Sequence, residues 1–187
     1  MKKEFNIQAI VPKLGFKIAH KDMSLPELSR FERYGYKFDF DVYLETKGCN
    51  LQRGFVWNLQ QKQEFIFSLL KDVNIPQFAV VVYSPSKDND HSVYKVIDGK
   101  QRLSTVMSFL KGEFPITVDE EDYLFSELPK DIKRIIEYWT PRAQVAYSYY
   151  DDKISDDDLI KWFNLLNFAG TEQEKSHKDK LNSLINK

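Results

Sequence analysis

Hydrophobic and polar residues alternate with a period of two over residues 37–44, which predicts a strand buried on one face. Residues 78–83 are a continuous apolar run, and residues 92–97 contain several β-branched residues, so both are expected to be strands. Residues 84–91 between them are polar and contain a proline, which predicts a turn and makes the pair a hairpin. A further strand is expected over residues 143–149, which contain Val and Tyr.

Two segments, residues 59–71 and 101–110, have apolar residues at the spacing of an α-helix. Asn58 is available to cap the first of them. In the second, Arg102 and Thr105 are expected to face away from the core, whose side is formed by Leu103, Val106, Met107 and Leu110. Further helices are expected over residues 24–34, 128–139, 156–168 and 172–186.

This order of strands and helices predicts an α+β fold, a small mixed β-sheet surrounded by several helices. The 187 residues are enough for one sizeable core, and no repeat, low-complexity segment or linker divides them. A hydrophobic content of 42% and a charged content of 29% are ordinary for a globular protein. We therefore expect residues 1–187 to form a single domain.

The composition also bears on the compartment. No apolar run approaches the roughly 20 residues of a transmembrane helix, and the N-terminus lacks the apolar stretch of a signal peptide. Cys49 is the single cysteine, so an internal disulfide framework is excluded and a reducing environment is favoured. The expectation is a cytoplasmic protein with no membrane partner.

The charges are nearly balanced. A net charge of −1 and a pI of 6.3 do not give the basic footprint of a dedicated nucleic-acid-binding protein. The carboxylates of Asp156, Asp157 and Asp158 cluster at an expected helix start, where they suit the helix dipole. They could also bind Ca²⁺ or Mg²⁺ weakly, although the spacing and glycine of an EF-hand are missing.

A strand-to-helix corner at residues 97–102 brings a carboxylate, a glycine and two cations together. The N-terminus of a helix presents unpaired N–H groups and partial positive charge, so it favours anions. Lys100 and Arg102 would neutralise phosphate groups there. Gln101 could orient a water, and Asp98 could hold Mg²⁺ or act as a base. A simple turn with solvated charges is the alternative interpretation.

A second group of this kind lies just before the helix at residues 59–71. Gln52 and Arg53 are followed by a glycine, Phe55 and Trp57. The guanidinium of an arginine suits phosphate or carboxylate, and aromatic side chains can wall an apolar slot for a base. The alternative is that the aromatics belong to the core and Arg53 pairs with a structural carboxylate.

These motifs occur in a recognisable order. Gln-Arg-x-Phe-Val-Trp at residues 52–57 is followed by Asn-Ile-Pro at 74–76, Val-Ile-Asp-Gly-Lys-Gln-Arg-Leu-Ser-Thr at 96–105 and Asn-x-x-Gly-Thr at 167–171. This order and spacing, over about residues 25–171, resembles the N-terminal domain of GmrSD-type restriction enzymes. That domain is itself similar to the ParB/sulfiredoxin superfamily, so the resemblance implies a ParB/sulfiredoxin-like fold.

The resemblance implies binding of a nucleoside triphosphate and, in relatives, its hydrolysis, which would make the chain a Mg²⁺-dependent nucleoside triphosphatase of a restriction-modification or phage-defence system. Asp98 and Gln101 are the expected catalytic residues, and Asp98 is also the expected Mg²⁺ ligand. The expected nucleotide-binding residues are Gln52, Arg53, Gly99, Lys100, Arg102, Thr105, Asn167 and Thr171.

The chain departs from the family pattern in two places. Lys100 stands where the family usually has Gln, and the sequence after Thr171 lacks the usual Leu-Ser-x-x-x-Glu. We also expect the C-terminal His-Asn-His nuclease module of the full-length enzymes to be absent, because too few residues follow Thr171 to hold it.

A second function is therefore open: a catalytically inactive regulatory module that senses a nucleotide or binds DNA or a protein, including as an antagonist of a restriction-type system. A partner could be DNA or a nuclease of a defence system. Direct nicking of DNA is a third interpretation, although the sequence shows no dedicated nuclease constellation of carboxylates and histidines.

Overall fold

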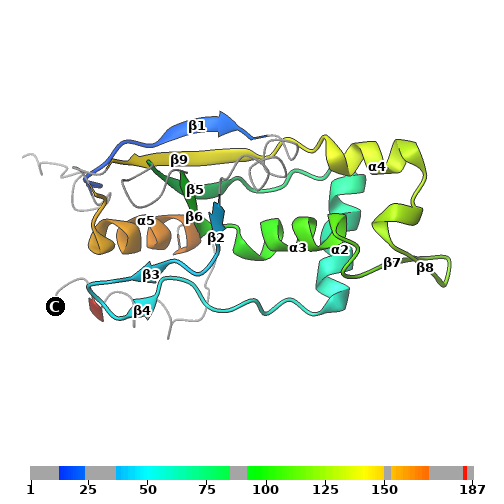
Figure 1. The fold of residues 1–187 in the computed structure, drawn as a ribbon, viewed down its shortest axis with the longest axis horizontal. Helices are drawn as coiled ribbons and strands as arrows, with labels where there is room; N and C mark the ends of the chain where they lie inside the picture. The colour runs from blue at the N-terminus through cyan, green and yellow to red at the C-terminus, as the bar shows by residue number, and fades with distance from the viewer. Residues whose placement is uncertain (1–12, 24–36, 85–91, 150–152, 169–182, 185–187) are drawn as a thin grey trace, which may run out of the picture.

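A five-stranded mixed sheet organises this computed structural model, which describes residues 13–23, 37–84, 92–149, 153–168 and 183–184 (Figure 1). In spatial order the strands are β1 (Ala19–Asp22), β9 (Arg142–Ser148), β5 (Phe78–Tyr83), β6 (Val93–Asp98) and β2 (Lys37–Asp39). The pairs β1–β9 and β5–β6 are antiparallel, whereas β9–β5 and β6–β2 are parallel. The predicted α+β class with a mixed sheet is confirmed, as is the antiparallel pairing of the two strands that flank residues 84–91.

Helices and two small hairpins complete the described fold. The helices are α2 (Leu59–Leu70), α3 (Lys100–Leu110), α4 (Lys130–Glu137) and α5 (Asp156–Phe168), with a 3₁₀ turn η2 (Phe125–Glu127). The hairpins pair β3 (Tyr43–Leu44) with β4 (Cys49–Asn50), and β7 (Ile116–Val118) with β8 (Glu121–Tyr123). Among the described residues, no helix combines the length and the apolar character needed to cross a membrane.

The sheet has a hydrophobic core on each face, because successive side chains of a strand point to opposite sides. In β5, Val80 and Val82 lie in the core that α2, α3 and α4 cover, whereas Ala79 and Val81 lie in the core that α5 covers. Leu51, which precedes the Gln-Arg motif, is fully buried in the second core. The residue that precedes the motif at 52–57 is therefore held in place by core packing.

The predicted single strand over residues 37–44 is wrong. The chain forms β2, bends, and then forms β3, which belongs to a separate hairpin. At the bend the backbone N–H of Asp41 donates to Asp39 Oδ1 at 3.0 Å. Such a local bond from an aspartate side chain competes with ladder pairing, and this breaks the strand despite its alternating pattern.

The helix predictions agree with the structure in type and differ at some ends. The capping box at Asn58 is present, and α5 has the expected bounds. In α3 the expected core face is partly wrong, because Phe109 is fully buried and Met107 is only half-buried. The helix expected over residues 24–34, and all but residues 183–184 of the one expected over 172–186, lie outside the described residues.

Candidate functional site

The side chain of Gln101 joins the two motif segments. Its Oε1 accepts hydrogen bonds from the backbone N–H groups of Val56 and Trp57, at 3.0 and 3.3 Å. Its Nε2 donates to the carbonyl of Gly54 at 3.1 Å. Residues 52–57 and the start of α3 therefore lie against each other, as a site shared by the two motifs requires. Because both ends of the amide are occupied, the geometry favours an anchoring role for Gln101 over the predicted orientation of a water.

Gln52 makes a second connection between the segments. Its Nε2 donates to the carbonyl of Val96 in β6, which directly precedes the corner. Arg53 follows directly, and its side chain is exposed. Within the described part of the chain no hydrogen bond or ion pair engages Arg53, so its charge is available to a ligand.

The corner itself depends on Gly99, which follows the last residue of β6 and occupies the N-cap position of α3. Its φ of +99° lies in the left-handed region, which side chains disfavour. A Cβ at this position would lie 2.6 Å from the Cβ of Phe78 in the neighbouring strand. Gly99 also offers no side chain to cap α3, so the first N–H groups of the helix keep the capacity to bind an anion.

Arg102 is held by the protein. Its Nη2 pairs with Asp98 Oδ2 at 2.7 Å, one helical turn away, and its Nη1 donates to the carbonyl of Pro76. Both Nη atoms also lie 3.4 Å from the carbonyl oxygen of Gln77. The side chain is 16% exposed and that of Asp98 is 26% exposed. Arg102 therefore connects the corner to the chain entering β5, which makes it a positioning residue.

Lys100 is a nearly buried cation. Only 7% of its side chain is exposed, and its Nζ pairs with Asp41 Oδ1. The partner is very different, because 74% of the Asp41 side chain is exposed to solvent. Asp41 lies on the bend between β2 and β3 and belongs to none of the sequence motifs. An Asp-x-Asp sequence in an alternating segment is the one signal that could have pointed to it.

Thr105 is placed differently from the prediction. It is fully buried in α3, and within the described part of the chain its hydroxyl has no hydrogen-bond partner. The expectation that Thr105 faces away from the core is wrong, because α3 packs against both α2 and η2 as well as the sheet, which widens its buried face. A contact between Thr105 and a nucleotide stays a prediction.

The late motif is described only in part. Asn167 Nδ2 donates to the carbonyl of Phe163 at 2.9 Å, within α5. The helix α5 packs against β6, and in Figure 1 its later turns lie toward the start of α3. Thr171 lies outside the described residues. The roles of Asn167 and Thr171 in binding stay predictions.

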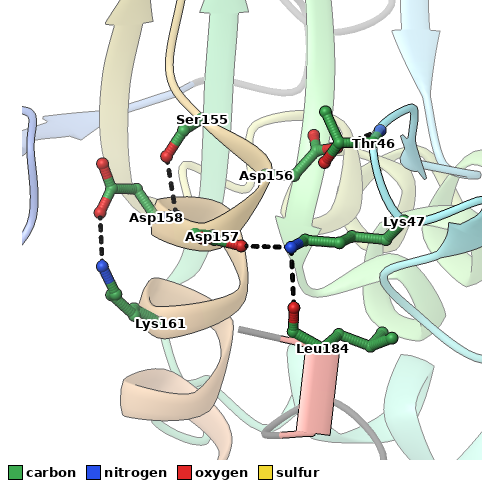
Figure 2. Close-up of polar contacts among 8 residues, drawn as sticks. All are labelled: Thr46, Lys47, Ser155, Asp156, Asp157, Asp158, Lys161 and Leu184. Atoms are coloured by element: carbon green, nitrogen blue, oxygen red, sulfur yellow. Dashed lines mark hydrogen bonds and ion pairs between the residues drawn. The ribbon is translucent and has the colours of Figure 1, made fainter. Parts of the chain in front are cut away.

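The carboxylates at the start of α5 are engaged by neighbouring side chains and backbone (Figure 2). The Ser155 hydroxyl accepts a hydrogen bond from the backbone N–H of Asp158 at 3.2 Å and so caps the helix. Each carboxylate has a partner: Asp156 accepts from the backbone and hydroxyl of Thr46, Asp157 pairs with Lys47 at 2.8 Å, and Asp158 pairs with Lys161 at 3.3 Å. These contacts make the cluster a structural joint between α5 and the loop at residues 45–48, and they remove support from a divalent-cation site there.

The corner fits the donor set that Mg²⁺ needs when a phosphate is bound. The ion usually takes one or two carboxylates together with phosphate oxygens and waters. Asp98 Oδ2 pairs with Arg102, and among the described residues no hydrogen bond or ion pair engages its Oδ1. Those residues contain no group of three or more His, Cys, Asp or Glu that could hold a metal by protein ligands alone. A Mg²⁺ ion here would therefore depend on the phosphates of a ligand.

A known protein family matches most of the chain. The sequence profile of the family described as GmrSD restriction endonuclease, N-terminal domain, matches residues 50–187. The matched part contains the residues of the corner, the Gln-Arg motif and the late motif, whereas Asp41 precedes it. No curated protein and no solved structure matches the chain.

Proposed function

The chain belongs to the family of GmrSD restriction endonuclease N-terminal domains, and on that basis we propose that it binds a nucleoside triphosphate at the corner between residues 52–57 and the start of α3. The bound nucleotide would control a partner in a restriction system, either DNA or a nuclease. The observation that carries this proposal is the Gln101 side chain, which fastens the Gln-Arg segment to the helix start by three hydrogen bonds.

The phosphate end of the ligand has a suitable environment. The uncapped N-terminus of α3 supplies backbone N–H groups and the positive end of the helix dipole. Lys100 adds a nearly buried positive charge, which is less screened by solvent than an exposed one. Arg53 adds an exposed guanidinium that can grip a phosphate with two hydrogen bonds.

The base end would lie along the same segment. Phe55 and Val56 are 40% and 51% exposed although both are apolar. One face of the Phe55 ring is covered by Lys62, whose Nζ lies 4.9 Å from the ring centroid. Exposed aromatic and aliphatic groups beside a phosphate site suit the flat apolar surface of a nucleobase.

If the nucleotide is hydrolysed, we expect Asp98 to be the residue that acts. Its carboxylate lies at the end of β6, within the corner. It would either hold Mg²⁺ against the phosphates or take a proton from the attacking water. Mg²⁺ would neutralise the charge that builds up on the phosphate oxygens. Arg102 keeps Asp98 in place through their ion pair, and Gln101 keeps the loop in place.

The proposal is tested by titrating the purified protein with ATP, GTP, CTP and UTP, with and without Mg²⁺, and by measuring released phosphate in parallel. We expect saturable binding of at least one nucleotide, which weakens about tenfold or more in an Arg53→Ala variant because a charge-assisted contact is lost. Arg142→Ala removes another exposed arginine, which lies in β9, and should bind as the parent does. Absence of binding to all four nucleotides would refute the proposal.

A further inference from the structure

The ion pair between Lys100 and Asp41 joins two residues with very different surroundings. Lys100 is almost completely buried, so a loss of its counter-ion without replacement would leave a buried charge unpaired. Asp41 is largely exposed and can be solvated by water if it leaves. Exchange of the carboxylate for another anion is therefore possible, whereas its simple departure is unfavourable.

The position of Asp41 makes such an exchange feasible. It lies on the bend between β2 and β3, and its backbone N–H donates to Asp39 Oδ1. This bond fixes the main chain of the bend and leaves the Asp41 carboxylate to Lys100. Rotation of one side chain into solvent would then release the cation without moving a strand.

We propose that Asp41 is a built-in competitor for phosphate: its carboxylate occupies the Lys100 cation in the ligand-free protein, and a phosphate group of the ligand displaces it. This inference rests on the proposed function, because it concerns the same corner. Asp41 would thereby lower the affinity of the site for its ligand. The site would fill only at ligand concentrations high enough to displace the Asp41 carboxylate from Lys100.

The test is a double-mutant cycle that measures binding of inorganic pyrophosphate and of ATP by calorimetry. Asp41→Asn keeps the size of the side chain and an oxygen that can accept from Lys100, but removes the negative charge. We expect it to bind both ligands about three- to tenfold more tightly than the parent, the range expected when a competing charge beside a buried cation is removed.

Lys100→Gln supplies the second side of the cycle and places at this position the residue that the family usually has. In that background Asp41→Asn should change affinity less than about twofold, because the competitor no longer has a cation to occupy. Asp119→Asn is the matched control. It makes the same charge change in the β7–β8 turn, at a positive φ of 51° that asparagine accepts, and should leave affinity unchanged.

The outcomes separate the two proposals. If the parent binds nucleotide and Asp41→Asn binds equally or more weakly, the inference is overturned and the proposed function stands. An equal gain in the Lys100→Gln background would mean a general charge effect and would also overturn it. If neither the parent nor Asp41→Asn binds pyrophosphate or ATP, the proposed function fails, and the inference fails with it. Circular dichroism of each variant confirms that the fold is retained.

Discussion

Replacement of Arg102 by alanine should destabilise the protein as well as affect its site. The side chain pairs with Asp98 and donates to the carbonyls of Pro76 and Gln77, so the variant loses an ion pair and the donors to two backbone groups. Exposed ion pairs are worth about 0–1 kcal/mol, and breaking a fully buried one costs about 3–5 kcal/mol. With side-chain exposures of 16% and 26%, this pair lies between these limits.

We therefore expect Arg102→Ala to lower the free energy of unfolding by about 2–3 kcal/mol. For a chain of this size that corresponds to a Tm lower by roughly 5–10 °C. Urea unfolding followed by tryptophan fluorescence measures the change, since Trp162 is 1% exposed and reports on the core. Arg102→Lys should recover part of the loss, because lysine keeps the charge without the planar fork.

Arg53→Ala is the matched control for this experiment. Arg53 is exposed and makes no hydrogen bond or ion pair with the described residues, so its removal should change the free energy of unfolding by less than about 0.5 kcal/mol. The two arginines thus separate stability from binding. If Arg102→Ala were as stable as Arg53→Ala, the argument that Arg102 holds the corner together would be refuted.

Three further changes test other parts of the account. Gln101→Ala should lower the free energy of unfolding, measured in urea, by about 1–2 kcal/mol and should speed amide hydrogen exchange at residues 54–57. Gln101→Glu should lower it less, because the glutamate oxygen can still accept both hydrogen bonds. Unchanged exchange in Gln101→Ala would contradict the anchoring role. Gly99→Ala should lower the free energy of unfolding by about 2–4 kcal/mol, because φ is positive there and the added Cβ would contact Phe78. Gly54→Ala is the control and should be nearly neutral, since open space surrounds Gly54. Equal stabilities of the two variants would contradict the role of Gly99. Burial, reinforced by Asp156, raises the pKa of Tyr83 from 10.0 to about 12, so between these pH values the folded state holds a proton that the unfolded state releases. The free energy of unfolding should therefore fall between pH 10 and 12 by more in the parent than in Tyr83→Phe. The same pH dependence in both proteins would disprove this linkage.

The sequence predicted the parts of the fold whose patterns are local. The strands at residues 78–83 and 92–97 and the helix α5 were evident because continuous apolar runs and capping residues act over a few positions. The edge strand β1 was missed, because its four residues are all exposed and show no alternation. Its pairing with β9 supplies the order that its own side chains do not encode.

The contact between the two motif segments agrees with a shared site, whereas the residues that bind a ligand there stay a prediction. Residue types and the order of the motifs suggested that the two segments serve one site, and the hydrogen bonds of Gln101 show that the segments are in contact. The partner of each side chain depends on residues distant in sequence, such as Asp41 for Lys100 and Pro76 for Arg102. No local pattern reports these pairings, so an arginine that appeared available for phosphate is in fact engaged by the protein.

The central claim is that residues 52–57 and the start of α3 form one site for a nucleoside triphosphate. The most direct measurement is a titration with the tightest-binding nucleotide, followed by NMR of the backbone amides. The account predicts that amides of residues 52–57 and 99–102 shift together, with a single Kd. Shifts confined to one segment, or centred on the groove of about 570 Å³ beside Tyr138 and Arg142, would contradict it.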